Sequence, residues 1–231
     1  CAKRADYQAH NRRMIGNLES PKVLVTAVNE PDAGKHFTSS DAGGLENTIV
    51  LAKGMRVMLT ANLDLPNGLT NGTIGYVRGI IYFNDDREIQ DDEIPTVLVE
   101  FSEYNGPSCL DNPPHIYPVS AIMRNWLVGK ENYSRKMLPL SAAYGMTIHK
   151  SQGQTLGKVV INLGSNEFAT GLTYTALSRV RCFNDLAFSP MPSISRLNAY
   201  FRRSDFALIK ADRLAKAEAA QVTLQQLGHQ G

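Results

Sequence analysis

The chain contains two kinds of strand-forming region, one with strands alone and one in which strands alternate with helices. Between Gly72 and about Met137, short apolar stretches such as residues 73–83 and 96–101 follow one another, with turn residues between them and no helical pattern. Short strands at this spacing are typical of a small antiparallel barrel. After Leu138 the pattern changes to strand, helix, strand, helix, which is typical of a parallel sheet with helices on its faces. We therefore predict an α/β layer that is interrupted by a β insertion.

Apolar runs, prolines and glycines place the individual elements. The expected helices cover residues 2–18, 150–156, 170–179 and 193–227. The expected strands cover residues 22–28, 55–61, 73–83, 96–101, 116–122, 138–148, 159–163 and 186–188. Residues 29–47 are expected to form a long loop, and residues 84–87 a turn.

Two kinds of side chain have an expected structural place. The basic side chains of the last helix are expected on a solvated face: Arg196, Arg202, Arg203, Lys210, Arg213 and Lys216. Trp126 is the only tryptophan. We expect it to close the core of the barrel rather than to stack on a nucleic-acid base.

Charge and cysteine content narrow the functional classes. A formal net charge of +2 over 231 residues gives no whole-chain polyelectrolyte signal, so any nucleic-acid site must be a local patch. Three widely spaced cysteines form no metal-binding pair and fit a reducing compartment. No apolar run has the length of a membrane span, and no signal peptide is visible. We therefore expect an intracellular protein that is not secreted, without a membrane partner or a metal site.

A polar segment follows the longest expected strand. His149, Lys150 and Ser151 supply two potential cations and a hydroxyl in succession, and Gly153 lets the backbone approach a ligand closely. Parallel sheets present functional groups at this place, where a strand ends and a helix begins. The segment is therefore a candidate phosphate site. In the alternative interpretation it is a helix start at which Ser151 and Gln152 only satisfy backbone amides.

A second polar segment ends in two arginines. Residues 174–181 form a helical pattern that finishes at Arg179, and Arg181 follows two residues later. An arginine at a helix end between two strands can reach a neighbouring phosphate, as arginine fingers do. The alternative is that both side chains are solvated or ion-paired, as most surface arginines are.

The chain has no pattern for holding the phosphates of ATP by itself. A phosphate loop needs Gly-x-x-x-x-Gly-Lys-Ser/Thr, whose backbone cradles the phosphates and whose hydroxyl binds magnesium. The Gly-Lys pairs at residues 34–35, 129–130 and 157–158 have neither that loop nor that hydroxyl. Residues 80–86 superficially resemble the metal-binding strand of such enzymes, but their Asn-Asp-Asp end is more simply a hairpin turn. We predict that this chain alone cannot hydrolyse ATP.

Three stretches recur together in a known family. Residues 143–156 contain Gly-Met-Thr-Ile-His-Lys-Ser-Gln-Gly-Gln-Thr-Leu, and residues 174–180 read Tyr-Thr-Ala-Leu-Ser-Arg-Val. These resemble motifs V and VI of superfamily 1 helicases of the petite-integration-frequency (Pif) and RecD-like type. Residues 53–73 resemble the segment before the barrel insertion of that family. The resemblance covers about residues 47–190, in the family's order and spacing.

The resemblance implies a fold and domain boundaries. It implies a RecA-like C-terminal motor lobe, which is a parallel sheet with helices, carrying an inserted Src-homology-like β-barrel and followed by a helical tail. Residues 1–72 would form the first part of the lobe, 73–137 the barrel, 138–190 the second part with motifs V and VI, and 191–231 the tail.

The resemblance also implies roles for individual residues. Arg179 would be the catalytic arginine that reaches the γ-phosphate of ATP, with Gly153 and Gln154 beside it at the nucleotide cleft. The residues that would border single-stranded DNA are Thr147, His149, Lys150, Ser151, Tyr174 and Arg181. The chain departs from the family pattern at Leu172, where relatives often carry Gln, and at Tyr144, where they carry Trp.

The implied activity is that of an ATP-dependent DNA helicase with 5′-to-3′ polarity, which acts in DNA repair, recombination and telomere maintenance. ATP and Mg²⁺ would be held mainly by an N-terminal motor lobe of the complete protein. The first residue is Cys1 rather than Met, which fits a part of a longer protein. The alternative is a non-catalytic nucleic-acid-binding remnant of a helicase, for example one carried by a mobile element.

Overall fold

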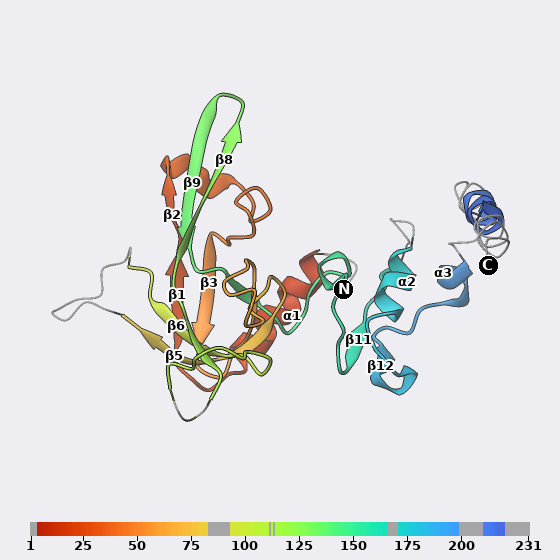
Figure 1. Ribbon diagram of the computed structural model, residues 1–231, viewed down its shortest axis with the longest axis horizontal. Helices are drawn as coiled ribbons and strands as arrows, with labels where there is room; N and C mark the ends of the chain where they lie inside the picture. The colour runs from red at the N-terminus through yellow and green to blue at the C-terminus, as the bar shows by residue number, and fades with distance from the viewer. Residues whose placement is uncertain are drawn as a thin grey trace, which may run out of the picture. The chain divides into compact units, whose positions relative to one another are not determined.

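The computed structural model describes residues 4–82, 93–110, 112, 114–165, 171–198 and 210–219 (Figure 1). The chain forms two compact units: the first is Lys3–Lys150, and the second is Ser151–Gly231 together with Cys1–Ala2. Antiparallel sheets, a parallel strand pair and helices make this a mixed α/β fold.

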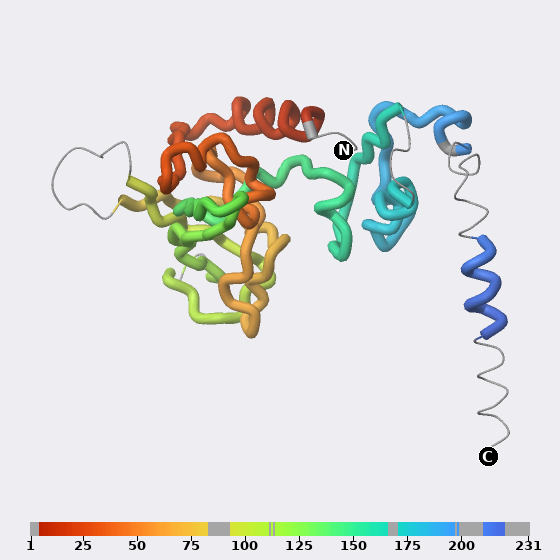
Figure 2. The backbone as a smooth tube through the Cα atoms, turned by 90° about the horizontal axis from the view of Figure 1, so that it is seen from above, coloured from red at the N-terminus to blue at the C-terminus, as the bar shows by residue number. Residues whose placement is uncertain are grey.

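Helix α1 (Arg4–Gly16) opens the first unit and lies along one side of it (Figure 2). Its sequence has no continuous apolar face. Tyr7 and Asn11 are the buried side chains among those described in the helix, and their spacing of four residues puts them on the same face. The helix predicted over residues 2–18 is confirmed for the described part.

A five-stranded antiparallel sheet has the order β10-β4-β5-β6-β7. Its strands are β4 (Arg56–Leu59), β5 (Ile74–Ile81), β6 (Thr96–Glu100), β7 (Ile116–Val119) and β10 (Leu140–Ala142). The first four confirm the strands predicted in these regions. β5 is a single strand whose register shifts between Val77 and Gly79, as at a β-bulge. The turn predicted at residues 84–87 lies outside the described residues.

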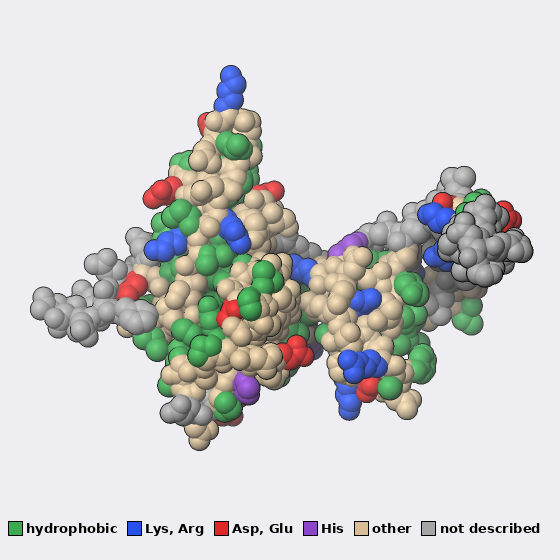
Figure 3. Space-filling view, viewed as in Figure 1, with side chains coloured by type: hydrophobic (Ala, Val, Ile, Leu, Met, Phe, Trp, Pro, Cys, Tyr) green, Lys and Arg blue, Asp and Glu red, His purple; other side chains and the backbone are tan. Residues whose placement is uncertain are grey.

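Two smaller sheets complete the first unit. Strand β1 (Lys22–Thr26) pairs antiparallel with β3 (Thr48–Ala52). Strand β9 (Glu131–Met137) lies between β2 (Val28–Glu30) and β8 (Ile122–Val128). The β8–β9 hairpin projects beyond the rest of the unit (Figure 1), and its turn carries the exposed Lys130. The space-filling view also shows positive charge at the end of this hairpin (Figure 3).

The strands of residues 73–137 pair with strands outside that range on both sides. β5 pairs with β4, which precedes the range, and β9 pairs with β2. A separate Src-homology-like barrel at residues 73–137, and the domain boundaries that go with it, therefore stay predictions. The long loop predicted over residues 29–47 is wrong in part, because this segment holds the end of β2 and the 3₁₀ helix η1 (Asp32–His36).

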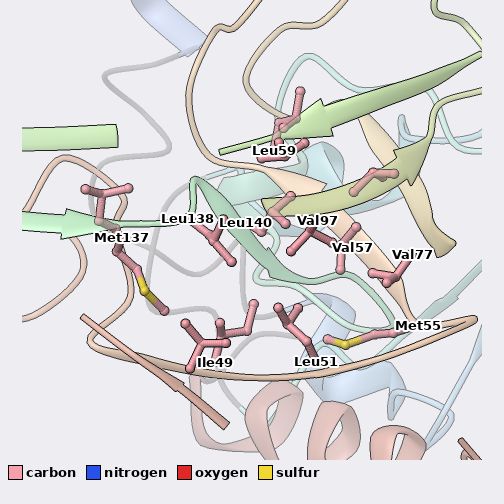
Figure 4. Close-up of a cluster of buried hydrophobic side chains, with 14 of the residues drawn as sticks. Ile49, Leu51, Met55, Val57, Leu59, Val77, Val97, Met137, Leu138 and Leu140 are labelled. Atoms are coloured by element: carbon pink, nitrogen blue, oxygen red, sulfur yellow. The ribbon is translucent and has the colours of Figure 1, made fainter. Parts of the chain in front are cut away.

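One apolar core holds the strands of the first unit together (Figure 4). Its fully buried members come from several strands and the segments between them: Leu51, Met55, Val57, Leu59, Val77, Val97, Met137, Leu138 and Leu140. Burial of one such side chain contributes about 1.5–3 kcal/mol. The alternating buried positions of β9 explain why this segment forms a strand at a sheet-to-core boundary, whereas β4 is buried over three consecutive residues, as in the interior of a fold.

Arg135 is a buried cation in β9 and has no exposed surface. It donates hydrogen bonds to Asn29 Oδ1 (2.8 Å) and to the carbonyl oxygens of Leu45 (2.9 Å), Gly34 (2.8 Å) and Phe37 (3.1 Å). Burial lowers the pKa of its guanidinium, and the nearby carboxylates of Glu46 and Asp41 act in the opposite direction. These bonds fix the segment between β2 and β3 against the hairpin.

Trp126 packs beside this cation. Its ring lies 5.8 Å from the rings of Phe37 and Tyr133, and the Arg135 guanidinium lies 5.7 Å from its centroid. The indole is partly buried and packs against the core. Trp126 thus packs within the fold, between the β8–β9 hairpin and the loop before β3, whereas its expected place in a barrel core stays a prediction.

The strand predicted over residues 138–148 is wrong beyond Ala142. β10 covers three residues and pairs antiparallel with β4, so the parallel arrangement expected for this segment is also wrong. The Ala143 N–H still donates to the Arg56 carbonyl oxygen of β4 at 3.0 Å, but the N–H and carbonyl oxygen of Gly145 bond to a side chain of α1. The helix predicted over residues 150–156 is replaced by one 3₁₀ turn, η2 (His149–Ser151).

The second unit contains the parallel pair β11 (Val159–Ile161) and β12 (Leu186–Phe188). Helix α2 (Leu172–Leu177), the 3₁₀ helix η3 (Phe183–Asp185) and helix α3 (Ile194–Asn198) accompany them, and residues 210–219 are helical. These elements confirm the predicted strands at 159–163 and 186–188 and the predicted helix at 170–179. The helix predicted over residues 193–227 is confirmed for 194–198 and 210–219.

The solvated face predicted for the basic tail is wrong at one residue. Arg196 is only 5% exposed, and its Nη2 donates to the carbonyl oxygen of Leu163 at 3.3 Å. Lys210, Arg213 and Lys216 are exposed as predicted, whereas Arg202 and Arg203 lie outside the described residues.

Within the described ranges, no helix is both long and apolar enough to cross a lipid bilayer. The same ranges contain no group of three or more His, Cys, Asp or Glu side chains placed to hold a metal ion.

Candidate nucleic-acid and nucleotide site

The loop after β10 (residues 143–150, the post-β10 loop) is fastened to helix α1 by one side chain. Asn11 Oδ1 accepts a hydrogen bond of 2.6 Å from the Gly145 N–H. Asn11 Nδ2 donates to the carbonyl oxygens of Gly145 (3.0 Å) and Ala142 (3.3 Å). A side-chain amide has both donors and an acceptor, so Asn11 replaces the neighbouring strand that these backbone groups lack.

Close packing holds the post-β10 loop on both sides of this contact. A Cβ atom on Gly145 would lie 3.2 Å from His10 Cδ2 and 3.5 Å from Tyr7 Cβ, so a larger residue would push the loop away from α1. On the other side, the Tyr144 hydroxyl accepts a hydrogen bond of 3.2 Å from the Arg56 N–H. Tyr144 therefore has a structural role at the position where the chain departs from the family pattern.

The predicted DNA-binding residues of the first unit lie at the end of this loop. The Thr147 hydroxyl accepts a hydrogen bond of 3.2 Å from the Lys150 N–H and so begins the turn of η2. His149 and Lys150 are exposed. The structure thus presents two potential cations next to each other, on a turn whose start is fixed by a hydroxyl.

A pocket of about 370 Å³ lies beside the same loop in the first unit. Residues of α1, β10 and the loop line it, among them Tyr7, Asn11, Arg12, Ser141, Gly145 and Lys150. The buried Ser141 hydroxyl has no hydrogen-bond partner among the described residues. Arg12 and Lys150 put positive charge at the exposed part of this lining.

In the second unit, Arg179 binds the backbone of the segment that follows η2. Its Nη1 donates to the carbonyl oxygens of Ser151 (3.1 Å) and Gln154 (3.2 Å). Its Nε donates to the Thr175 carbonyl oxygen at 2.7 Å, and its Nη2 to the Ser178 hydroxyl at 2.7 Å. The Arg179 carbonyl oxygen in turn accepts from the Leu156 N–H at 2.7 Å. The ends of the two polar sequence segments therefore meet at this arginine.

The predicted nucleotide-binding residues form one cluster with Arg179. Gly153 is exposed and has a φ of 82°, in the left-handed region that favours glycine. It lies in a turn that the Gln154 N–H closes by donating to the Ser151 carbonyl oxygen at 3.1 Å. The Arg179 guanidinium remains partly exposed beside this turn. A cation next to an exposed glycine turn is suited to an anionic ligand.

The remaining predicted contacts lie on the surface of the second unit. Tyr174, in α2, is 76% exposed, and Arg181 is exposed after the end of that helix. Leu172 is buried on α2, so the residue that departs from the family pattern here packs inside the unit. Among the predicted site residues of this unit, Ser151, Gly153, Gln154 and Arg179 come together around one turn.

Sequence reasoning missed Asn11 as a residue of the site. The partner that it binds lies 134 residues further along the chain, so no local pattern connects the two. The available signal was an asparagine four residues after Tyr7 in a helix without a continuous apolar face, because asparagine is a poor helix former.

Comparisons with known proteins found relatives in one helicase family, although no family model matches the chain. The ATP-dependent DNA helicase PIF7 of Trypanosoma brucei brucei is 30% identical over 226 residues, which covers 89% of this chain and 22% of that protein. The ATP-dependent DNA helicase PIF1 of Rattus norvegicus is 35% identical over 192 residues, which covers 80% of this chain and 26% of that protein.

Solved structures share the fold. A crystal structure of Pif1 helicase from Candida albicans matches with a TM-score of 0.69 and 23% identity, covering 94% of this chain and 49% of that chain. Bacteroides Pif1 bound to single-stranded DNA matches with a TM-score of 0.63 and 23% identity, covering 95% and 45%. These neighbours fit a RecA-like helicase lobe for the mixed α/β fold. The chain spans about a quarter of the length of the two curated relatives. By sequence and by fold, it belongs to the Pif1-type superfamily 1 helicases.

Proposed function

We propose that this chain is the C-terminal motor part of an ATP-dependent DNA helicase of the Pif1 type, to which it contributes single-stranded DNA contacts and an arginine finger. Relatives that are 30% and 35% identical to this chain are named ATP-dependent DNA helicases. Similar structures hold single-stranded DNA or ADP-AlF4. By family likeness, the polarity is 5′-to-3′ and, if the cell is eukaryotic, the protein acts in the nucleus or the mitochondrion.

The observation that carries the proposal is the position of Arg179. Hydrogen bonds to the Ser151 and Gln154 carbonyl oxygens hold its guanidinium beside the exposed turn at Gly153. A guanidinium held in this way is oriented before the ligand arrives, which lowers the cost of placing positive charge against a phosphate. An arginine finger stabilises the charge that develops on the transferring phosphoryl group.

The proposed DNA contacts divide by chemistry. Lys150 and Arg181 are exposed cations suited to backbone phosphates, which supply most of the affinity of such proteins. The exposed ring of Tyr174 is suited to stacking on a base. His149 and the hydroxyl of Thr147 are further proposed contacts in the first unit, and the backbone of Ser151 is one in the second.

In this proposal, ATP is the substrate of the complete protein and Mg²⁺ is its cofactor. The chain has no phosphate-loop sequence, so an N-terminal motor lobe would hold both, and Arg179 would complete the site from the second lobe. Nucleotide binding would then close the two lobes on one DNA strand. A barrel formed within residues 73–137 would help to hold that strand.

The test is the change Arg179→Ala in the complete protein. DNA-stimulated ATP hydrolysis should fall by about 10³-fold or more, because an arginine finger contributes that much to turnover. Single-stranded DNA affinity, measured by fluorescence anisotropy, should change by less than about threefold, because the finger acts on the nucleotide.

Arg181→Ala is the matched control, since it removes the same side chain two residues away. It should weaken DNA binding and reduce the slope of log affinity against log salt by about one, with turnover at saturating DNA retained. Normal turnover of the Arg179→Ala protein would overturn the assignment of the finger.

A further inference from the structure

We infer that Asn11 is a positioning residue for the DNA-binding end of the post-β10 loop, so that helix α1 sets the affinity of the motor for single-stranded DNA. This inference rests on the proposed function. Asn11 is 6% exposed and touches neither of the two predicted DNA-binding cations through a hydrogen bond that the structure records. Asn11 therefore affects DNA binding indirectly, through the position of the post-β10 loop.

The first step is that Asn11 holds the loop at the point where it leaves the sheet. β10 ends at Ala142. The carbonyl oxygen of Ala142 and, three residues later, the carbonyl oxygen and the N–H of Gly145 all bond to the Asn11 side chain. Backbone groups that leave a sheet need other partners, and a loop with fixed partners keeps one conformation. Asn11 thus determines where the chain goes after β10.

The second step is that the loop and the helix fit closely at Gly145. The space for a Cβ atom on Gly145 is limited by His10 and Tyr7, which are neighbours of Asn11 on α1. The hydrogen bonds and the packing act on the same residue from the same helix. The hydrogen bonds therefore fix the orientation of the Gly145 backbone, and the packing fixes its distance from α1.

The third step connects Gly145 with the DNA-binding side chains. Thr147 follows two residues later, and its hydroxyl fixes the turn that presents His149 and Lys150. A functional side chain must be held to within about 0.5 Å to keep its contacts. Loss of the Asn11 bonds therefore displaces the hydroxyl and both cations together.

The test compares Asn11→Ala with Asn17→Ala in the complete protein. Asn11→Ala should raise the DNA concentration for half-maximal stimulation of ATP hydrolysis about tenfold, since it removes three hydrogen bonds that place the loop. The maximal rate at saturating DNA should stay within about twofold, because the nucleotide contacts of the second unit are untouched. Asn17 is exposed just after the same helix, so Asn17→Ala should change neither quantity.

Two further variants separate positioning from simple loss of stability. Asn11→Asp keeps an acceptor for the Gly145 N–H but places a carboxylate oxygen against the carbonyl oxygens of Ala142 and Gly145, so its half-saturating DNA concentration should be at least as high as that of Asn11→Ala. Gly145→Ala changes the loop residue of the same contact. Its added Cβ atom lies close to His10 and Tyr7, so it should displace the loop and raise the half-saturating DNA concentration. If Asn11→Ala fails to fold, these two variants carry the test.

Three outcomes decide the inference. A folded Asn11→Ala protein with unchanged half-saturation would overturn it. A lower melting temperature with an equal loss of maximal rate and no shift in half-saturation would also overturn it, because that is the result of a purely structural role. Faster hydrogen exchange of the Gly145 amide together with weaker DNA binding would support it.

The experiments also separate this inference from the proposed function. If the protein shows no DNA-stimulated hydrolysis, or if Arg179→Ala keeps normal turnover, the helicase assignment or its finger fails. Direct DNA binding and amide exchange of the Asn11 variants still report on the loop, because neither measurement needs ATP. Asn11→Ala with unchanged exchange at Gly145 would overturn the positioning role alone.

Discussion

Arg135 and Arg179 hold a loop in the same chemical way, one in each unit of the molecule. Each donates four hydrogen bonds, mostly to backbone carbonyl oxygens. Arg135 is fully buried between the hairpin and the loop before β3, with Trp126 against it. Arg179 is partly exposed beside a glycine turn.

The difference between them separates a structural cation from one that is proposed to act on a ligand. A buried guanidinium has lost its hydration and needs every one of its bonds, so it cannot turn to a ligand. A partly exposed one keeps access to solvent and can exchange a carbonyl oxygen for a phosphate. Burial, more than the number of hydrogen bonds, tells the two roles apart.

The largest effect on stability should come from Arg135→Ala. The change removes the Arg135 donor from the carbonyl oxygens of Phe37 and Leu45, while the Gly34 carbonyl oxygen keeps the Phe37 N–H, and we expect a loss of about 4 kcal/mol in the free energy of unfolding. Urea denaturation followed by the fluorescence of Trp126 reports on this unit. Arg179→Ala should lower the free energy of unfolding by about 1 kcal/mol, measured by urea denaturation that is monitored by circular dichroism. Equal losses would break the comparison.

Leucine-to-alanine changes should show a smaller version of the same contrast. Leu140 is fully buried in β10, and Leu140→Ala should lower the free energy of unfolding by about 3 kcal/mol through loss of burial and creation of a cavity. Leu177 is 37% exposed at the end of α2, and Leu177→Ala should cost less than about 1 kcal/mol. A larger loss for Leu177→Ala would mean that the second unit depends on this side chain more than its exposure indicates.

The smallest effect concerns pH and the loop held by Arg135. Hydrogen bonds from the Thr38 hydroxyl and N–H lower the pKa of Asp41 below its usual 3.8, with a further contribution from Arg135. A lowered pKa in the folded state stabilises the fold above the unfolded-state value, and this contribution is lost as the pH falls through the folded value. Asp41→Asn should therefore be less stable than the wild type near pH 7, and the difference should shrink below about pH 4.

Urea midpoints of both proteins at pH 7, 5 and 3 measure this difference. A stability difference that stays constant from pH 7 to pH 3 would show that the carboxylate charge of Asp41 does not stabilise the folded loop.

The sequence was sufficient for elements whose signal is local. Strand β4 follows from a run of apolar residues that are buried on both sides, and α2 and the pair β11–β12 follow from the alternation of helical and strand patterns. The resemblance implied a nucleotide cleft at Arg179, Gly153 and Gln154, and the structure places the Arg179 guanidinium against the Gln154 carbonyl oxygen. The roles assigned to those residues stay predictions.

The errors all involve partners that are distant in the sequence. The apolar pattern of residues 138–148 continues past Ala142, but Asn11 and Tyr144 provide the bonds that take the backbone out of the sheet. Arg196 has the sequence context of a surface helix, and it is buried because the Leu163 carbonyl oxygen lies beside it. None of these three side chains gives a periodic signal, because each bonds to a residue that is distant in the sequence.

The contact between Asn11 and Gly145 also has a consequence for the order of folding. It closes a loop of 134 residues, so its formation must follow that of the strands in between, which bring the two ends together. During synthesis, α1 leaves the ribosome well before Gly145 does, and it waits without its partner while the sheets assemble. The part of the chain proposed to touch DNA is thus completed last, and folding intermediates of the first unit should be inactive in DNA binding even when their core is formed.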